Sequence, residues 1–174
     1  FWATGHPQVA VLAMIAALYH ILNHALFKGL LFLGAGAILH ATHEQNLEHM
    51  GGLIHRLPYT AFFFLIGCLS ISGLPPFNGF VSEWLTFQAA LQAPNFESGV
   101  LRAMIPISAA LLALTAALSA TCFVKAFGVA FLGQPRTRHV RHGREIDFGM
   151  RTAQALLAGL CFLLGILPTT VIGL

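Results

Sequence analysis

The sequence predicts an all-α integral membrane protein, because it is too apolar for a soluble fold and its apolar residues fall in long runs. Of 174 residues, 57% are hydrophobic and 9% are charged, and the mean hydropathy is +0.78. Soluble domains carry about 25% charged residues. Runs such as 100–132 exceed the roughly 20 residues that cross a bilayer as a helix. They lack the strict alternation of membrane strands, so a helical bundle is expected.

Five membrane segments are expected in a single membrane domain that covers residues 1–174. Pro7 and Pro58 suit the first turns of the first and second helices. The expected segments are 8–41, 58–73, 79–93, 100–132 and 152–173. The chain begins with Phe1 and shows no signal peptide before the first segment. We therefore expect it to be the C-terminal part of a longer subunit.

The sequence SGLPPFNGF interrupts the helix between the second and third segments. Pro75 and Pro76 cannot continue a helix, and Gly79 follows them. The segment 79–93 is short for a complete crossing, so the loop 74–80 is expected to lie partly within the membrane. Such a pattern is typical of the broken helices of transporters.

Five of the seven arginines lie in or beside the loop before the last segment. The positive-inside rule predicts that this loop, from Arg136 to Arg151, lies on the cytoplasmic side of a bacterial inner membrane. Because the basic residues gather there, the net charge of +3 does not indicate a nucleic-acid surface. Counting crossings back from it, we expect Phe1 and the Pro75–Pro76 break on the cytoplasmic side. The loop 42–57 is then expected on the opposite side.

Three ionisable residues fall in the middle of the first expected segment. His20, His24 and Lys28 are four residues apart, which places them along one face of a helix. An ionisable residue inside a span costs about 2.5–3.5 kcal/mol, so a functional role as a proton relay is expected. The alternatives are hydrogen bonds to neighbouring helices and snorkelling of Lys28 to an interface.

A metal or haem site at His20 and His24 is not expected, because no carboxylate or thiolate lies within the next helical turn. The sequence also contains no cluster-ligating set of cysteines and no nucleophile with a base. We therefore expect no cofactor, no metal and no active site within this chain.

Two more ionisable residues lie in or near expected segments. Glu83 directly follows the break, and it is expected to change its protonation during transport. Its alternative role is that of a helix-cap carboxylate that stabilises the break. Lys125 lies near the cytoplasmic end of the fourth segment, where a relay role and snorkelling are both open.

The stretches NHALFKGLLFLGAGA, SGLPPFNGFVSEWL and ALSATCFVKAFGVAFLGQPR resemble a known family. It comprises the antiporter-like proton-translocating subunits of complex I, of Mrp antiporters and of energy-converting hydrogenases, and the likeness is strongest to the hydrogenase-4 and formate hydrogenlyase branch. The resemblance implies a larger inverted-repeat fold with ionisable residues at mid-membrane. It implies that His20, His24 and Lys28 match the family's HxxxHAxxK helix. Glu83 takes a lysine or glutamate position after the break, and Lys125 takes a cationic position in the next helix.

The resemblance further implies proton translocation across the inner membrane within a membrane-bound hydrogenase complex. The implied partners are other membrane subunits, a peripheral redox module and the lipid bilayer. Any oxidoreductase activity of the complex would belong to those partners. The first alternative is a subunit of NADH-quinone oxidoreductase or of a Mrp-type Na⁺/H⁺ antiporter, and the second is a scaffold subunit that does not transport.

Overall fold

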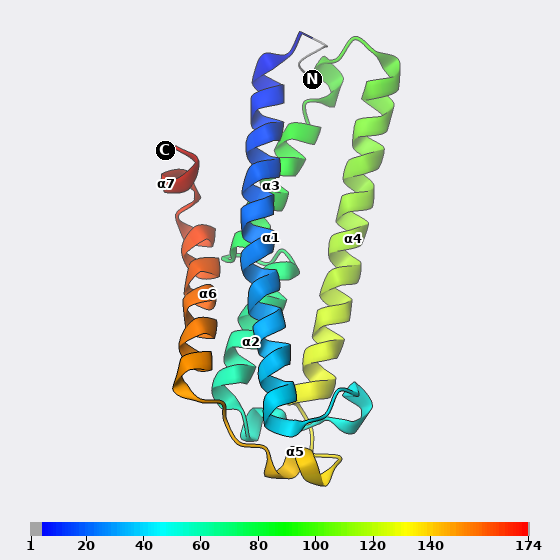
Figure 1. Cartoon of the computed structure of the whole chain (residues 1–174). Helices are drawn as coiled ribbons and strands as arrows, with labels where there is room; N and C mark the ends of the chain where they lie inside the picture. The colour runs from blue at the N-terminus through cyan, green and yellow to red at the C-terminus, as the bar shows by residue number, and fades with distance from the viewer. Residues whose placement is uncertain (1–4, 174) are drawn as a thin grey trace.

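The computed structural model describes residues 5–173, apart from the side chain of Arg138, and these residues form a helical bundle (Figure 1). Its main helices are α1 (Pro7–Thr42), α2 (Pro58–Ile71), α3 (Asn78–Ala90), α4 (Gly99–Phe131) and α6 (Phe148–Ile166). The short elements are η2 (Leu47–His49), η3 (Leu53–His55), η4 (Ala93–Asn95), α5 (Arg138–His142) and α7 (Pro168–Ile172). No strand occurs in this part of the chain. The prediction of an all-helical membrane fold is confirmed.

Within residues 5–173, three helices, α1, α4 and α6, are long and apolar enough to cross a membrane. The helices α2 and α3 have 14 and 13 residues, fewer than the roughly 20 that a crossing needs. Figure 1 shows them following one another along α1. We interpret them as the two halves of one interrupted crossing, and the prediction of five separate segments is not confirmed.

The last expected segment also divides into two helices. α6 ends at Ile166, and Pro168 begins α7. Proline has no N–H to donate to the preceding turn, so a new helix starts there.

The break between α2 and α3 lies about midway along α1. Asn23, near the middle of α1, forms hydrogen bonds with Asn78, the first residue of α3. The prediction that the break lies on the cytoplasmic side is therefore wrong. Its two proline residues, Pro75 and Pro76, are exposed and joined by a cis peptide bond. Because each half helix covers only part of a crossing, the junction falls between the two ends of the bundle.

The loops after α1 and after α4 pack together at the lower end of Figure 1. The backbone N–H of Gly52 donates to the carbonyl of Leu132 at 2.9 Å. The guanidinium of Arg136 donates to the carbonyl of Glu48 at 3.1 Å. Met50, Leu53 and Val140 from these loops pack in one apolar cluster with residues at the ends of α1 and α4, such as Ile38 and Phe131.

These contacts contradict the prediction that the loop 42–57 lies on the opposite side from the arginine-rich loop. The interpretation of α2 and α3 as two halves of one crossing, rather than as two crossings, accounts for this arrangement. The start of α1 at Pro7 then lies at the other end of the bundle (Figure 1). Phe1, whose side was also predicted, lies outside the described residues.

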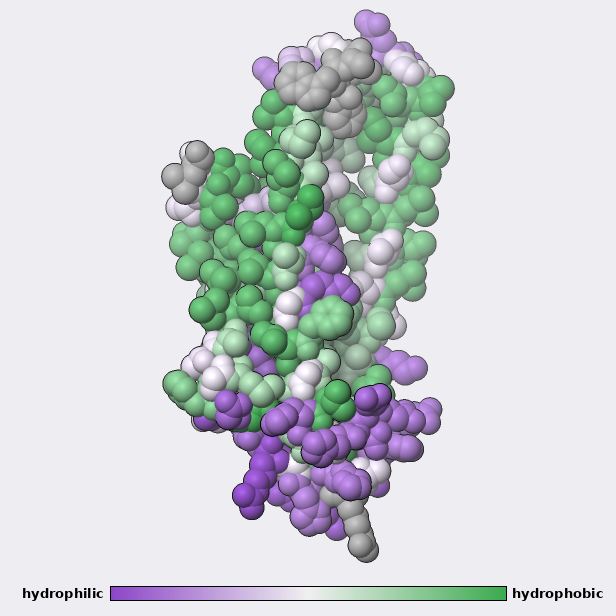
Figure 2. All heavy atoms as spheres, in the orientation of Figure 1, coloured by the Kyte–Doolittle hydropathy of each residue, from purple (hydrophilic) through white to green (hydrophobic). Residues whose placement is uncertain are grey.

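The surface agrees with a membrane protein. Figure 2 shows a long hydrophobic mid-section, with hydrophilic residues gathered around the lower loops. It also shows a hydrophilic patch within that mid-section, between α1 and α4. The patch marks the region in which polar side chains from different helices meet.

Candidate functional site

The contact between α1 and α3 rests on a reciprocal pair of buried amides. The side-chain N–H of Asn23 donates to the backbone carbonyl of Asn78 at 3.0 Å, and the side-chain N–H of Asn78 donates to Asn23 Oδ1 at 3.2 Å. Both residues are fully buried. Because an unpaired amide in an apolar interior is costly, this pair fixes the start of α3 against α1.

One turn away, the same two helices bring His20 and Ser82 together. His20 Nδ1 lies 3.0 Å from Ser82 Oγ, which also lies 3.0 Å from the carbonyl oxygen of Gly79. When the hydroxyl donates to Gly79, it accepts a hydrogen bond from a proton on Nδ1. When it turns toward His20, it donates to an unprotonated Nδ1. One hydroxyl therefore serves both states of the ring nitrogen.

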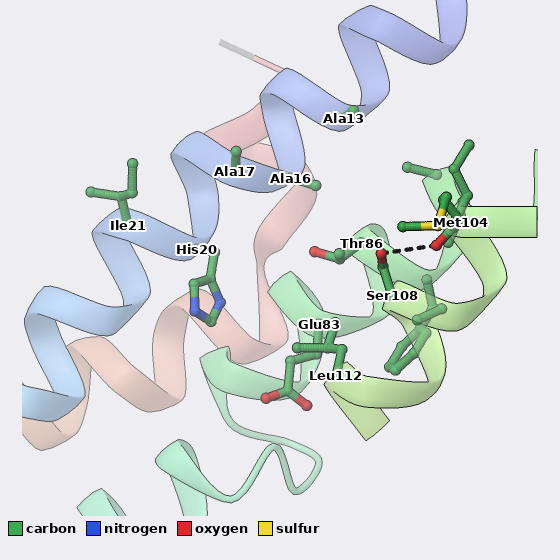
Figure 3. Close-up of a pocket in the computed structure, with 15 residues that line it drawn as sticks. Ala13, Ala16, Ala17, His20, Ile21, Glu83, Thr86, Met104, Ser108 and Leu112 are labelled. Atoms are coloured by element: carbon green, nitrogen blue, oxygen red, sulfur yellow. Dashed lines mark hydrogen bonds between the residues drawn. The ribbon is translucent and has the colours of Figure 1, made fainter. Parts of the chain in front are cut away.

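His20 and Glu83 line the same cavity, which has a volume of about 610 Å³ and lies between α1, α3 and α4 (Figure 3). Thr86 and Ser108 add hydroxyl groups to its wall, and alanine and larger apolar residues form most of the rest. Both His20 and Glu83 are partly buried. The structure thus brings two titratable side chains from different helices to one cavity beside the helix break.

The carboxylate of Glu83 does not cap the helix. Glu83 is the sixth residue of α3, counted from Asn78, so it lies beyond the first turn. Among the described residues, no hydrogen bond or ion pair involves this carboxylate. The hydroxyl of the neighbouring Ser82 contacts His20 and Gly79 instead of Glu83. Its oxygens instead lie against Gly73, at the end of α2.

The other predicted residues lie outside the cavity. The ring of His24 is exposed, its centroid is 6.1 Å from that of His20, and it makes an edge contact with Phe27. Lys28 is partly buried and follows His20 by two turns, about 12 Å along the helix axis. Lys125 is exposed on α4. The structure therefore places His20 and Glu83 at one cavity and leaves His24, Lys28 and Lys125 outside it.

Gly79 has a packing role at the break. A Cβ on Gly79 would collide with the carbonyl oxygen of Ser70, in the last turn of α2. On α6, a Cβ on Gly165 would collide with the carbonyl oxygen of Pro76. Backbone approaches backbone closely at both points, which keeps the two half helices and α6 together.

Sequence reasoning missed Asn78 and the contact between Ser82 and His20. A signal was present, because Asn78, Ser82 and Thr86 recur at four-residue intervals on the short third segment. That spacing predicts a polar stripe along one face of a helix. What the spacing lacks is the identity of the opposing helix, which the structure supplies as α1.

The chain is similar to known membrane proteins. Residues 8–105 match the family described as NADH:quinone oxidoreductase/Mrp antiporter, TM. Hydrogenase-4 component B of Escherichia coli is 47% identical over 160 residues, which cover 92% of this chain and 24% of that protein. Formate hydrogenlyase subunit 3 of the same organism is 36% identical over 164 residues, covering 94% and 27%.

A solved structure shares the fold. A chain of the membrane-bound sulfane sulfur reductase, an archaeal respiratory membrane complex, matches with a TM-score of 0.75 at 28% identity, covering 93% of this chain and 25% of that one. The present chain spans about a quarter of the length of the curated relatives that it matches. It belongs to the NADH:quinone oxidoreductase/Mrp antiporter transmembrane family, as an antiporter-like membrane protein.

Proposed function

We propose that this chain carries part of a proton pathway across the inner membrane, within an antiporter-like subunit of a membrane-bound hydrogenase complex. The observation that carries the proposal is the shared cavity of His20 and Glu83 beside a helix break. Ionisable side chains in a membrane interior are costly, and they mark ion pathways when they face a cavity. The identity of 47% to a hydrogenase component supports the choice of complex.

In the proposed pathway a proton passes between the carboxylate of Glu83 and the imidazole of His20 through water in the cavity. Ser82 supports this step, because its hydroxyl can accept from or donate to Nδ1 of His20. From His20 the proton would continue along α1 by way of His24 and Lys28. Lys125 on α4 is proposed as a further proton-carrying residue of the pathway.

We also propose the orientation and the partners of the chain. Both packed loops would face the cytoplasm, since the arginine-rich loop is one of them and the positive-inside rule favours that side. Other membrane subunits and a peripheral redox module would complete the complex. Electron transfer would take place in that module, and it would change the protonation of the titratable side chains in this chain.

The experiment that tests the pathway is proton uptake into proteoliposomes that contain the whole parent complex, with redox turnover measured separately. We expect Glu83→Gln and Lys28→Ala each to abolish most of the uptake while turnover continues, because each removes a titratable group. Glu97→Gln is the matched control, since Glu97 is an exposed acid outside the helices. It should leave uptake at the wild-type level.

Other outcomes favour the alternatives. Unchanged uptake in both variants would reduce these residues to structural polar groups and favour the scaffold role. Uptake that requires sodium would favour a Mrp-type antiporter. A complex that oxidises NADH rather than hydrogen would favour the NADH-quinone oxidoreductase assignment.

A further inference from the structure

Gly73 closes α2 at the helix break, and its backbone conformation explains part of its presence. Its φ is +63°, a left-handed conformation that favours glycine. The N–H of Gly73 donates to the carbonyl of Ser70 at 3.2 Å, and the N–H of Leu74 donates to Leu69 at 3.2 Å. This pattern of hydrogen bonds terminates a helix at a left-handed glycine.

A second constraint on Gly73 has nothing to do with the turn. A Cβ at this position would overlap Glu83 Oε2, and it would lie 3.0 Å from Cδ and 3.3 Å from Oε1. All three carboxyl atoms of Glu83 thus lie around the face of the glycine that lacks a side chain. In Figure 3 the carboxylate of Glu83 points away from Ser108 of α4.

We propose that Gly73 is a positioning residue for Glu83: its missing side chain provides the space that holds the carboxylate at the break. The proposal deepens the proposed pathway and rests on it. The carboxylate of Glu83 lies against Gly73 at the end of α2, and Glu83 is also one of the residues that line the cavity together with His20. The glycine therefore decides which position the proton-carrying oxygens occupy.

The collision would move the carboxylate without breaking the fold. The atoms that a Cβ would meet at Gly73 belong to the far end of a flexible side chain, which can rotate away. At Gly79 the collision is with backbone, which cannot yield in this way. A substitution at Gly73 thus displaces Glu83, at a structural cost set by the left-handed turn.

The chain offers a matched control for that cost. Gly133, after α4, is also left-handed with φ +77°, but a Cβ there would meet no atom within 4 Å. Gly133→Ala therefore carries the same kind of backbone strain as Gly73→Ala, without touching a side chain. Differences between the two variants report on the carboxylate.

The test measures proton uptake by the whole parent complex in proteoliposomes, together with its thermal unfolding. We expect Gly73→Ala to lower uptake at least tenfold relative to Gly133→Ala, since displacements of about 1 Å can cost ~100-fold in reactions that need precise placement. The two variants should unfold at similar temperatures. Equal uptake in both variants would overturn the proposal.

A double-mutant comparison separates displacement of the Glu83 carboxylate from disruption of the turn at Gly73. Glu83→Asp shortens the side chain by one methylene and draws the carboxylate back from Gly73. We expect adding Gly73→Ala to the Glu83→Asp variant to change uptake less than twofold, whereas it changes the wild type at least tenfold. Equal losses in both backgrounds would show that the turn, and not the carboxylate, is what the substitution disturbs.

Failure of this proposal and failure of the pathway give different results. If Glu83→Gln pumps normally, the pathway itself is wrong. If Glu83→Gln abolishes uptake but Gly73→Ala matches Gly133→Ala, the pathway stands and only the role of Gly73 is refuted.

Discussion

Polar residues behave differently on the two sides of the cavity. Where α1 meets α3, Asn23 pairs with Asn78 and His20 bonds to Ser82, so each of these four side chains has a partner on the other helix. On α4, most hydroxyl groups bond to a carbonyl one turn earlier in the same helix. These bonds are Ser108 to Met104, Thr115 to Leu111 and Thr121 to Ala117.

This difference shows why polarity within a span is not enough to identify a site. The α4 helix satisfies most of its hydroxyls by itself, and Lys125 is exposed on this helix beyond the cavity. Ser119 is the exception, because its hydroxyl donates to the carbonyl of Ile71 at 3.4 Å, at the end of α2. The α1–α3 side is a built polar contact, and the α4 side is mainly a surface that borders the cavity.

The largest expected effect on stability is at the backbone contact of the break. Gly79→Ala should destabilise the protein by about 3 kcal/mol, at the upper end for overpacking, because Ser70 cannot move its carbonyl away. Thermal or denaturant unfolding of the solubilised protein measures this. Gly128→Ala on α4 is the control, since a Cβ there meets nothing within 4 Å. If Gly128→Ala lowered the free energy of unfolding as much as Gly79→Ala, the backbone contact at the break would not be the cause of the loss.

An intermediate effect is expected at the buried amide pair. Asn23→Ala should cost about 2 kcal/mol, because it leaves both the side-chain N–H and the backbone carbonyl of Asn78 without a partner. Asn78→Ala should cost about 1 kcal/mol, because Asn23 then loses only the bond to its Oδ1 and still donates to the backbone carbonyl at position 78. The double variant should cost less than the sum, with a coupling of roughly 0.6–1.7 kcal/mol. Unfolding of the four members of this cycle measures the coupling. Strict additivity would mean that the amides contribute independently.

The smallest effect is expected on α4. Thr115→Val removes a hydroxyl that bonds only to Leu111 of its own helix, so the change in unfolding free energy should stay within about 0.5 kcal/mol. The same unfolding assay checks it. A cost comparable to that of Asn78→Ala would show that the hydroxyl groups of α4 contribute more to stability than their contacts suggest.

Much of the fold followed from the sequence, because apolar runs and prolines act locally. The first helix was expected at 8–41 and is Pro7–Thr42, and the fourth was expected at 100–132 and is Gly99–Phe131. The crossing count failed at the break, since local patterns cannot tell two short crossings from two halves of one. That single error also reversed the expected side of the loop 42–57.

The candidate site divides in the same way. His20 and Glu83 were singled out because charge inside an apolar run is costly, and this cost depends on the residue type and its neighbours in the chain. Their shared cavity could not be predicted, because it depends on how α1, α3 and α4 pack.

The sequence by itself determined that the chain is a membrane-embedded helical bundle with a proline break and a row of ionisable residues. Composition and periodicity are enough for this, because the bilayer imposes the same length and polarity on every span. Only the tertiary structure decided that the break lies at mid-bundle, that Asn78 and Ser82 face α1, and that Glu83 rests against Gly73. These facts depend on contacts between residues far apart in the chain, and close packing rather than local preference selects them.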